Sequence, residues 1–145
     1  MRKLIVIFAS VVITTISNAQ VAPDGSPVAI HGALSVSGSK IIDSHGAVTS
    51  LAGMSFFWSQ WAGQFYNENC VKWLASDWNC SIVRAAMAVE SDGYLTNPST
   101  EKAKVEAVVD ACIKAGLYVI IDWHDHNAHN HQQSSIDFFK EMATK

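Results

Sequence analysis

The sequence lacks features that would identify several classes of protein. Ten basic and thirteen acidic residues among 145 leave no basic stripe of the kind that binds nucleic acid. Its three cysteines, an odd number, include none of the close pairs that zinc sites use, although Cys70 and Cys80 could form one disulfide bridge. The sequence contains no internal repeat and no low-complexity tract. We therefore expect no nucleic-acid partner, whereas a neutral substrate remains open.

The apolar run at the N-terminus is too short to span a membrane comfortably. Arg2-Lys3 precedes this run, which extends from residue 4 to residue 16, and the small residues Ser17-Asn18-Ala19 follow it. This order is typical of a secretory signal peptide. We predict that residues 1–19 are removed by cleavage near Ala19, that the protein is secreted to the periplasm or the exterior, and that no stable membrane insertion follows. The mature chain would keep eight basic and thirteen acidic residues, a formal charge of −5.

The residues after the predicted signal peptide favour a linker followed by a hairpin. A linker-like N-terminus is predicted over 20–31, because Val21–Pro27 contains two prolines and a glycine. A β-hairpin is predicted next, with Leu34-Ser35-Val36 and Lys40-Ile41-Ile42-Asp43 on either side of the turn Ser37-Gly38-Ser39. Such a hairpin can close one end of a barrel or form a simple sheet edge.

Strand and helix patterns alternate from residue 50 onward. Apolar runs predict strands at 50–56, 82–87 and 118–122, and the third run, without polar alternation, is typical of a strand buried on both faces. Each strand is followed by a helix pattern, so we expect an α/β fold with a parallel sheet and right-handed crossovers. Three strands do not close a barrel, and eight βα units need roughly 250 residues. We therefore expect the chain to be the N-terminal portion of a longer protein.

The helix patterns predict which side chains face the core. A helix over Glu68–Ser76 would turn Val71 and Leu74 inward. A long helix is predicted to begin at Asn97-Pro98, with Asn97 as its cap, and to end at Gly116. The apolar face of the long helix is formed by Val105, Val108, Val109, Cys112 and Ile113, with Cys112 as a buried free thiol. The apolar face of the last helix is formed by Ile136, Phe139 and Met142.

Polar and aromatic side chains gather where the predicted strands end, which is where βα enzymes place their chemistry. Phe56-Phe57-Trp58-Ser59-Gln60-Trp61 combines aromatic rings with amides and hydroxyls and suits stacking on a sugar ring. Alternatively these rings cap the core, which is expected for Phe56 and stays open for Trp61. Arg84 stands inside an apolar strand and, if buried, needs an anionic partner, for which a carboxylate from another strand is the natural candidate. A purely structural ion pair is the alternative. The third strand breaks into Asp122-Trp123-His124-Asp125-His126.

Four motifs in this order resemble glycoside hydrolase family 5. They are Gly53-Met54-Ser55-Phe56-Phe57-Trp58-Ser59-Gln60-Trp61, Val83-Arg84-Ala85-Ala86-Met87, Asp92-Gly93-Tyr94 and Val119-Ile120-Ile121-Asp122-Trp123-His124. Together they are similar to the N-terminal part of bacterial secreted endo-β-1,4-glucanases, over about Gly32 to Lys145. The resemblance implies that 32–145 is an incomplete catalytic domain, with three βα units and the hairpin of a (β/α)₈ TIM barrel.

The resemblance also implies a mechanism and a substrate. Members of the family cleave β-1,4-glucan with retention, using an acid/base glutamate after strand four and a nucleophilic glutamate after strand seven. Both would lie beyond Lys145, so we predict that the 145-residue chain alone is inactive. By their motif positions, Arg84 would hydrogen-bond the nucleophile and lower its pKa, His124 would lie beside the reacting sugar, and Trp61 would stack on a more distant glucosyl unit.

Two further residues are expected to contact the substrate. Gln60 and Tyr94 are the remaining substrate-binding candidates, and no cofactor is expected. Some relatives have a histidine at the position of Phe57 and a tyrosine at that of Ala88, so the fine shape of the cleft is open. Mannan or a mixed-linkage glucan is the alternative substrate to β-1,4-glucan.

The histidine-rich stretch after the third strand offers an alternative chemistry. Asp122–His131 contains four histidines and two aspartates, which could ligate zinc and support a metal-dependent hydrolase. His124 already belongs to the glycosidase motif, and the other histidines lie on a predicted loop rather than at helical spacing. We therefore predict solvated loop histidines and no metal site. A non-catalytic glycan-binding fragment is the third possibility.

Overall fold

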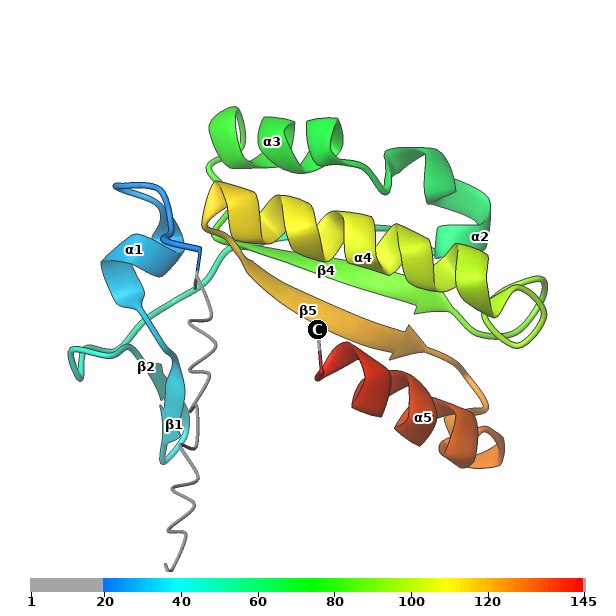
Figure 1. Cartoon of the computed structure of the whole chain (residues 1–145). Helices are drawn as coiled ribbons and strands as arrows, with labels where there is room; N and C mark the ends of the chain where they lie inside the picture. The colour runs from blue at the N-terminus through cyan, green and yellow to red at the C-terminus, as the bar shows by residue number, and fades with distance from the viewer. Residues whose placement is uncertain (1–19, 145) are drawn as a thin grey trace, which may run out of the picture.

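The computed structural model describes residues 20–144, so the predicted signal peptide lies outside the described residues. Figure 1 shows α3 and α4 side by side along the strands of a parallel sheet, with α5 beyond β5. The elements in chain order are α1 Pro27–His31, β1 Ser35–Ser37, β2 Lys40–Ile42, β3 Gly53–Ser55, α2 Ser59–Ala62, the 3₁₀ turn η1 Gly63–Phe65, α3 Glu68–Ser76, β4 Ile82–Ala88, α4 Pro98–Ala115, β5 Tyr118–His124, the 3₁₀ turn η2 Ala128–Asn130 and α5 Gln132–Met142. None of the helices in residues 20–144 combines the length and apolar content needed to cross a membrane.

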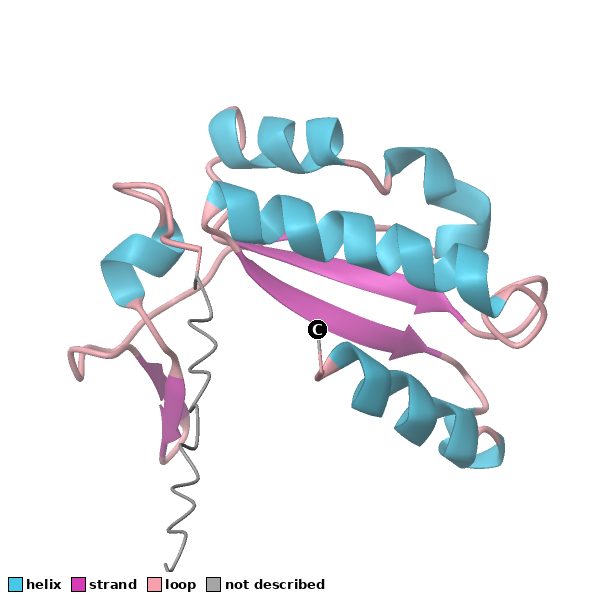
Figure 2. Cartoon of the chain, viewed as in Figure 1, coloured by secondary structure: helices cyan, strands magenta, loops and turns pink. Residues whose placement is uncertain are grey.

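The larger sheet has the order β3-β4-β5, and both pairings are parallel. This confirms the predicted succession of three βα units. The register places Arg84 beside Ser55 on one side and beside Ile120 on the other, and it places Ala88 beside His124. Because parallel strands end at the same edge of a sheet, the segments that follow β3, β4 and β5 gather there, beyond the arrowheads in Figure 2.

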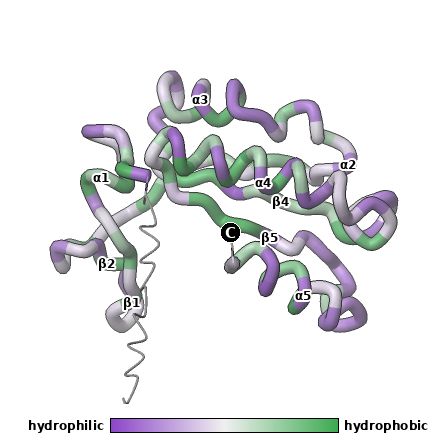
Figure 3. The backbone as a smooth tube through the Cα atoms, in the orientation of Figure 1, coloured by the Kyte–Doolittle hydropathy of each residue, from purple (hydrophilic) through white to green (hydrophobic). Residues whose placement is uncertain are grey.

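Alternation along β4 and β5 separates a core face from a polar face. Val83, Ala85 and Met87 are fully buried beneath α4, where Val105, Val108 and Cys112 are also fully buried. Figure 3 shows hydrophobic residues along β4 and along the first part of β5. The opposite face of β4 and β5 carries Arg84, Asp122 and His124, whose side chains contact one another. The core therefore lies between sheet and helices, and the polar groups lie on the other face.

The helix ends follow the sequence closely, with one exception. Helix α3 has the predicted bounds, and Val71 and Leu74 are buried as expected. Helix α4 stops where Gly116 adopts a left-handed conformation with φ of 67°, a backbone shape that glycine adopts without strain. The prediction that Asn97 caps α4 through its side chain is wrong, because Asn97 Nδ2 donates to Asp92 O at 3.0 Å instead.

Three predictions about burial are also wrong. On α5, Phe138 is fully buried, whereas Ile136 and Phe139 are about two-fifths exposed, because ring contacts with Tyr94 and Trp123 draw Phe138 into the core. On α4, Ile113 is exposed. Strand β5 is not buried on both faces: as the edge of the described sheet it leaves Ile120 exposed. All three cysteines lie within the described residues and are free, and Cys112 is buried as predicted.

The last five residues of the segment predicted as linker-like form the docked helix α1, which corrects that expectation for residues 27–31. Ser26 caps α1 by accepting a hydrogen bond from Ala29 N at 3.3 Å, and Val28 N donates to Gly116 O at 2.9 Å. The hydroxyl of Tyr118 then donates to Gly32 O at 2.6 Å. The predicted hairpin follows as antiparallel β1 and β2 and lies near the N-terminal ends of the strands, opposite the polar edge (Figure 1).

Candidate active site

Arg84 is the centre of a polar cluster built from all three parallel strands. Its Nη1 donates to Ser55 Oγ of β3 at 2.8 Å, and its Nη2 donates to Asp122 Oδ2 of β5 at 2.6 Å. The predicted carboxylate from another strand is therefore Asp122. The register explains this contact, because Asp122 lies two residues beyond the neighbour of Arg84 and on the same face. The side chain of Arg84 is 36% exposed, so it is not a buried charge but one that keeps a face toward the solvent.

His124 joins this cluster through Nδ1. That atom lies 3.0 Å from Arg84 Nη2 and 3.0 Å from Asp122 Oδ2. A guanidinium only donates hydrogen bonds, so Nδ1 can accept from Arg84 only when it carries no proton. If Nδ1 carries a proton, it donates to Asp122 Oδ2 instead, and its N–H lies against an N–H of Arg84. When Nδ1 accepts from Arg84, the ring proton lies on Nε2, and Nε2 can then donate to a ligand hydroxyl.

Aromatic rings extend from His124 toward the solvent. Trp58 packs edge-on against His124 at a centroid distance of 4.3 Å and against His126 at 5.1 Å. Trp61 lies 5.4 Å from Trp58, and its side chain is 60% exposed. Phe56 is buried against Tyr66, as predicted for a residue that caps the core. An exposed indole next to hydrogen-bonding groups suits a sugar ring, which has an apolar face and polar edges.

The other two predicted substrate contacts occupy different surroundings. Both amide atoms of Gln60 are buried and have no hydrogen-bond partner among residues 20–144. Tyr94 packs its ring against Trp123 at 5.1 Å and against Phe138 at 5.5 Å, at the margin of the core. Substrate contact by Gln60 and Tyr94 stays a prediction. The cluster around Arg84 and the exposed ring of Trp61 are what the structure brings together.

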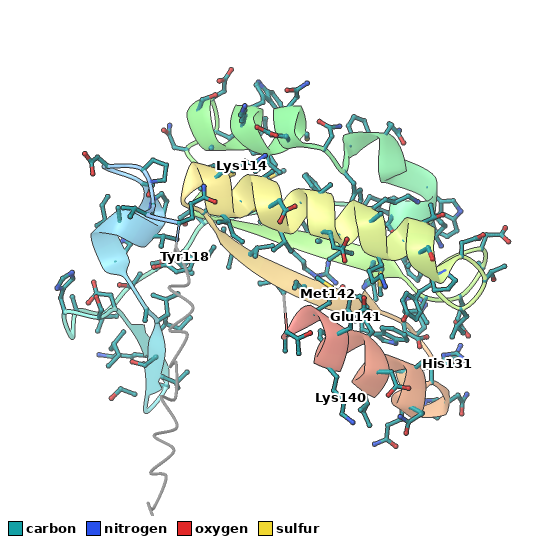
Figure 4. All side chains as sticks on the ribbon, in the orientation of Figure 1. Lys114, Tyr118, His131, Lys140, Glu141 and Met142 are labelled. Carbon is teal, nitrogen blue, oxygen red and sulfur yellow. The ribbon has the colours of Figure 1, made fainter. Side chains whose placement is uncertain are left out.

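The loop after β5 is stabilised by its own polar contacts. Asp125 has a fully buried carboxylate that lies 2.7 Å from His131 Nδ1, and it accepts from Asn127 N at 2.8 Å. Burial alone would raise the pKa of Asp125, but hydrogen bonds from His131, Asn127 N and Trp123 outweigh it and hold this pKa below its usual value. Figure 4 shows His131 beside the start of α5.

One group in residues 20–144 has the residue types of a metal site. Donor atoms of Glu90, Asp125 and His131 lie within 4.8 Å of one another. The donors already have protein partners, because Asp125 pairs with His131 and both oxygens of Glu90 accept from Asn127 Nδ2 at 3.0 and 3.1 Å. A hydrogen-bonded loop therefore accounts for the group, and a metal would have to displace these bonds.

Sequence reasoning did not assign three residues that the site uses. Asp122 was visible as part of the motif, but its pairing with Arg84 depends on the strand register. Ser55 holds the other side of the guanidinium at the end of β3. Trp58 connects Trp61 to His124. The alternation of side chains on parallel strands is the signal that could have found Ser55 and Asp122.

A parallel sheet with a charged cluster at its carboxyl edge defines the class of α/β proteins that place ligands at the strand ends. Comparison with known proteins identifies the family. The family model "Cellulase (glycosyl hydrolase family 5)" matches residues 42–145, so the chain belongs to glycosyl hydrolase family 5. The described residues form three βα units of its (β/α)₈ barrel.

Relatives similar to this chain include endoglucanases. Endoglucanase Z of Dickeya dadantii is 53% identical over 116 residues, which cover 77% of this chain and 27% of that protein. An endoglucanase of Clostridium saccharobutylicum is 40% identical over 115 residues, with 77% and 26% covered. The chain thus spans about a quarter of the length of these relatives.

Solved structures agree with this family. A structure from Cytophaga hutchinsonii has a TM-score of 0.80 and 53% identity, and the match covers 81% of this chain and 39% of that one. The catalytic domain of Thermobifida fusca endoglucanase Cel5A has a TM-score of 0.78 and 34% identity, with 82% and 40% covered. That domain has also been solved in complex with cellotetraose.

Proposed function

We propose that the protein to which this chain belongs is a secreted endo-β-1,4-glucanase that hydrolyses glucan with retention of configuration. The observation that carries the proposal is the cluster of Arg84, Asp122 and His124 beside exposed Trp61, in a chain of glycosyl hydrolase family 5. The relatives named endoglucanases and the cellotetraose complex of a structural neighbour support a β-1,4-glucan substrate.

The geometry suggests a role for each residue. Asp122 and Ser55 fix the guanidinium of Arg84 while a third of its side chain remains exposed and able to meet a second carboxylate. A fixed cation beside a nucleophilic carboxylate favours its ionised form. His124 offers Nε2–H to a sugar hydroxyl, and Trp61 offers a ring face to a glucosyl unit. Binding to these groups would orient the glucan for cleavage by two glutamates contributed by later strands.

The stereochemical proposal has a direct test. A retaining glycosidase holds its two catalytic carboxyl groups about 5–5.5 Å apart, so that one attacks the anomeric carbon and the other protonates the leaving oxygen. NMR of the first products released from a β-glucan should show the β-anomer before mutarotation. Initial release of the α-anomer would contradict retention.

Residues 20–145 alone should be inactive. The acids near the strand ends are Glu90, Asp92, Asp122 and Asp125, and none matches a catalytic position of the family. Asp122 is paired with Arg84, and Asp125 is paired with His131. The segment, purified free of host glycanases, should not reduce the viscosity of carboxymethyl-cellulose. A reproducible loss that disappears in His124→Ala would overturn this assignment.

Secretion is part of the same proposal, and N-terminal sequencing of the protein from culture fluid checks it. The expected first residue is Gln20, while a mature protein that still begins at Met1 inside the cell would contradict the signal peptide.

A metal-dependent hydrolase is the second candidate, favoured only by the proximity of Glu90, Asp125 and His131. Activity retained after treatment with a chelator supports the glycosidase, because its chemistry uses carboxylic acids. Activity lost in chelator and restored by Zn²⁺ would support the metal enzyme.

A further inference from the structure

Glu101, in the first turn of α4, is a buried carboxylate that the proposed chemistry does not use. Its side chain is 2% exposed, and it accepts a hydrogen bond from Ser59 Oγ of α2. Ser59 is fully buried, and its Oγ accepts from Ala88 N, at the end of β4, at 2.8 Å. Elements far apart in the sequence, namely α2, β4 and α4, thus meet at one hydroxyl group.

Lys104 holds the same serine from a second side. Its Nζ donates to Glu101 Oε1 at 2.5 Å and to the backbone Ser59 O at 2.9 Å. Gly63 leaves room for this side chain, since a Cβ at that position would lie 3.0 Å from Lys104 Cε. Ser59 is therefore held at its side chain and at its carbonyl group by two residues of one rigid helix.

These contacts of Ser59 with Glu101 and Lys104, called the tether below, matter because α2 is too short to be stable without tertiary contacts. It has four residues, and Trp58 at its N-cap position gives it no side-chain cap. Helices this short are unstable without tertiary contacts. Trp61, the exposed ring proposed to stack on a glucosyl unit, projects from this turn two residues after Ser59.

We propose that Glu101 is a positioning residue that acts through Ser59 to hold Trp61 at the cleft. The proposal rests on the proposed function for its substrate, but the tether itself does not. Glu101 would thereby set the affinity for glucan chains long enough to reach Trp61. It would not set the rate of bond cleavage at the Arg84 and His124 end.

Glu101→Gln in the whole protein tests this with little change in volume. Ser59 Oγ and Lys104 Nζ both donate to the carboxylate of Glu101. The amide nitrogen of glutamine must face one of them, and because it is also a donor, one of the two hydrogen bonds is lost. We expect KM for cellopentaose to rise about 2- to 10-fold, which corresponds to the loss of one aromatic contact. The kcat for a short aryl cellobioside should stay within about twofold. Asp110→Asn, exposed on the same helix, is the matched control and should change neither value.

A double-mutant cycle separates positioning from mere stabilisation. If Glu101 acts through Trp61, Glu101→Gln adds no further rise in KM to that of Trp61→Ala. Additive effects, or a lower melting temperature with an unchanged KM for cellopentaose, would make Glu101 a structural ion pair and overturn the proposal. If Glu101→Gln does not fold, Lys104→Met removes the bond to Ser59 O and should give the same KM pattern.

Hydrogen exchange provides a readout that needs no substrate. The amides of Trp61 and Ala62 donate to Trp58 O at 3.1 and 2.9 Å, so loosening of α2 should speed their exchange. Exchange in α3 should stay unchanged. Faster exchange with no glucan cleavage by the wild-type protein would disprove the proposed function while keeping the tether. Unchanged exchange would disprove the tether whatever the activity.

Discussion

The aromatic segment, residues 56–61, and the histidine loop, residues 124–131, are stabilised in different ways although both follow a strand at the same edge. The aromatic segment is held from inside the protein by Ser59 and Glu101, which are at most 2% exposed. The histidine loop is held largely by its own residues, through Asp125 with His131 and through exposed Asn127 with Glu90. The two regions meet where Trp58 packs against His124.

Burial makes the difference energetically important. A buried polar group that loses its partner bears the full cost of desolvation, whereas an exposed group can bond to water. The aromatic segment therefore has little freedom, although it displays one of the most exposed rings of the site. The histidine loop can change its contacts at smaller cost, because only Asp125 is fully buried.

Of the changes that test this contrast between the two regions, removal of the Glu101 carboxylate should have the largest effect on the free energy of unfolding. Glu101→Ala removes the carboxylate that pairs with both Ser59 Oγ and Lys104 Nζ, and breaking a buried ion pair in this way costs about 3–5 kcal/mol of unfolding free energy. Denaturant unfolding of the whole protein measures the loss. Asp110→Asn on the same helix should change stability by less than about 0.5 kcal/mol. A loss from Glu101→Ala as small as that of the control would remove the contrast between the regions.

Arg84→Lys should have the next largest effect, because Arg84 bridges the end of β3 and the polar face of β5. Lysine keeps the charge but cannot donate in a plane to Ser55, Asp122 and the proposed nucleophilic carboxylate. We expect kcat to fall about 100-fold, as when one positioned donor is lost from an active site. Stability should change by less than about 1 kcal/mol, since the pair is partly exposed. Normal turnover with a much lower melting temperature would make Arg84 structural.

Tyr66→Phe should weaken the aromatic segment by a smaller amount. The Tyr66 hydroxyl lies 2.7 Å from Phe57 O and 2.8 Å from Ala86 O, so its loss should cost about 1–2 kcal/mol. Burial raises the pKa of Tyr66 above its usual value of 10.0. A raised folded pKa means that the contribution of this group is complete below pH 10 and is lost as the pH rises toward the folded value.

The pH dependence of this effect is a check on the burial of Tyr66. Stability curves of the wild type and Tyr66→Phe should converge as the pH rises above 10, because the unfolded wild-type chain then ionises. Parallel curves at all pH values would show that the hydroxyl is not buried.

Asp125→Asn should have the smallest effect and should act on the histidine loop. The pKa of Asp125 is lowered, so its contribution is present above the usual value of 3.8 and is lost as the pH falls through the lower folded value. We expect a loss of about 1 kcal/mol at pH 7 that disappears in acid. Thermal unfolding from pH 7 to pH 2 measures this. His129→Ala in the same exposed loop should have no effect at any pH, and a difference that grows in acid would contradict the assignment.

Local signals determined much of the fold. The inward face of α3 follows from the spacing of Val71 and Leu74, and the stop of α4 follows from a glycine able to adopt a positive φ. The parallel sheet follows from the alternation of strand and helix patterns. The family motifs singled out Arg84, His124 and Trp61 as candidate site residues by residue type and order alone.

Long-range packing decided what these signals left open. Arg84 and Asp122 are 38 positions apart in the sequence, and their pairing depends on the register between β4 and β5. The inward turn of Phe138, rather than Phe139, depends on rings supplied by the loop before α4 and by β5. The bond between Glu101 and Ser59 joins residues 42 positions apart. Local conformational preferences act within a few residues and specified the elements, whereas contacts between elements set the partners of polar groups, because only the folded chain brings those groups out of water together.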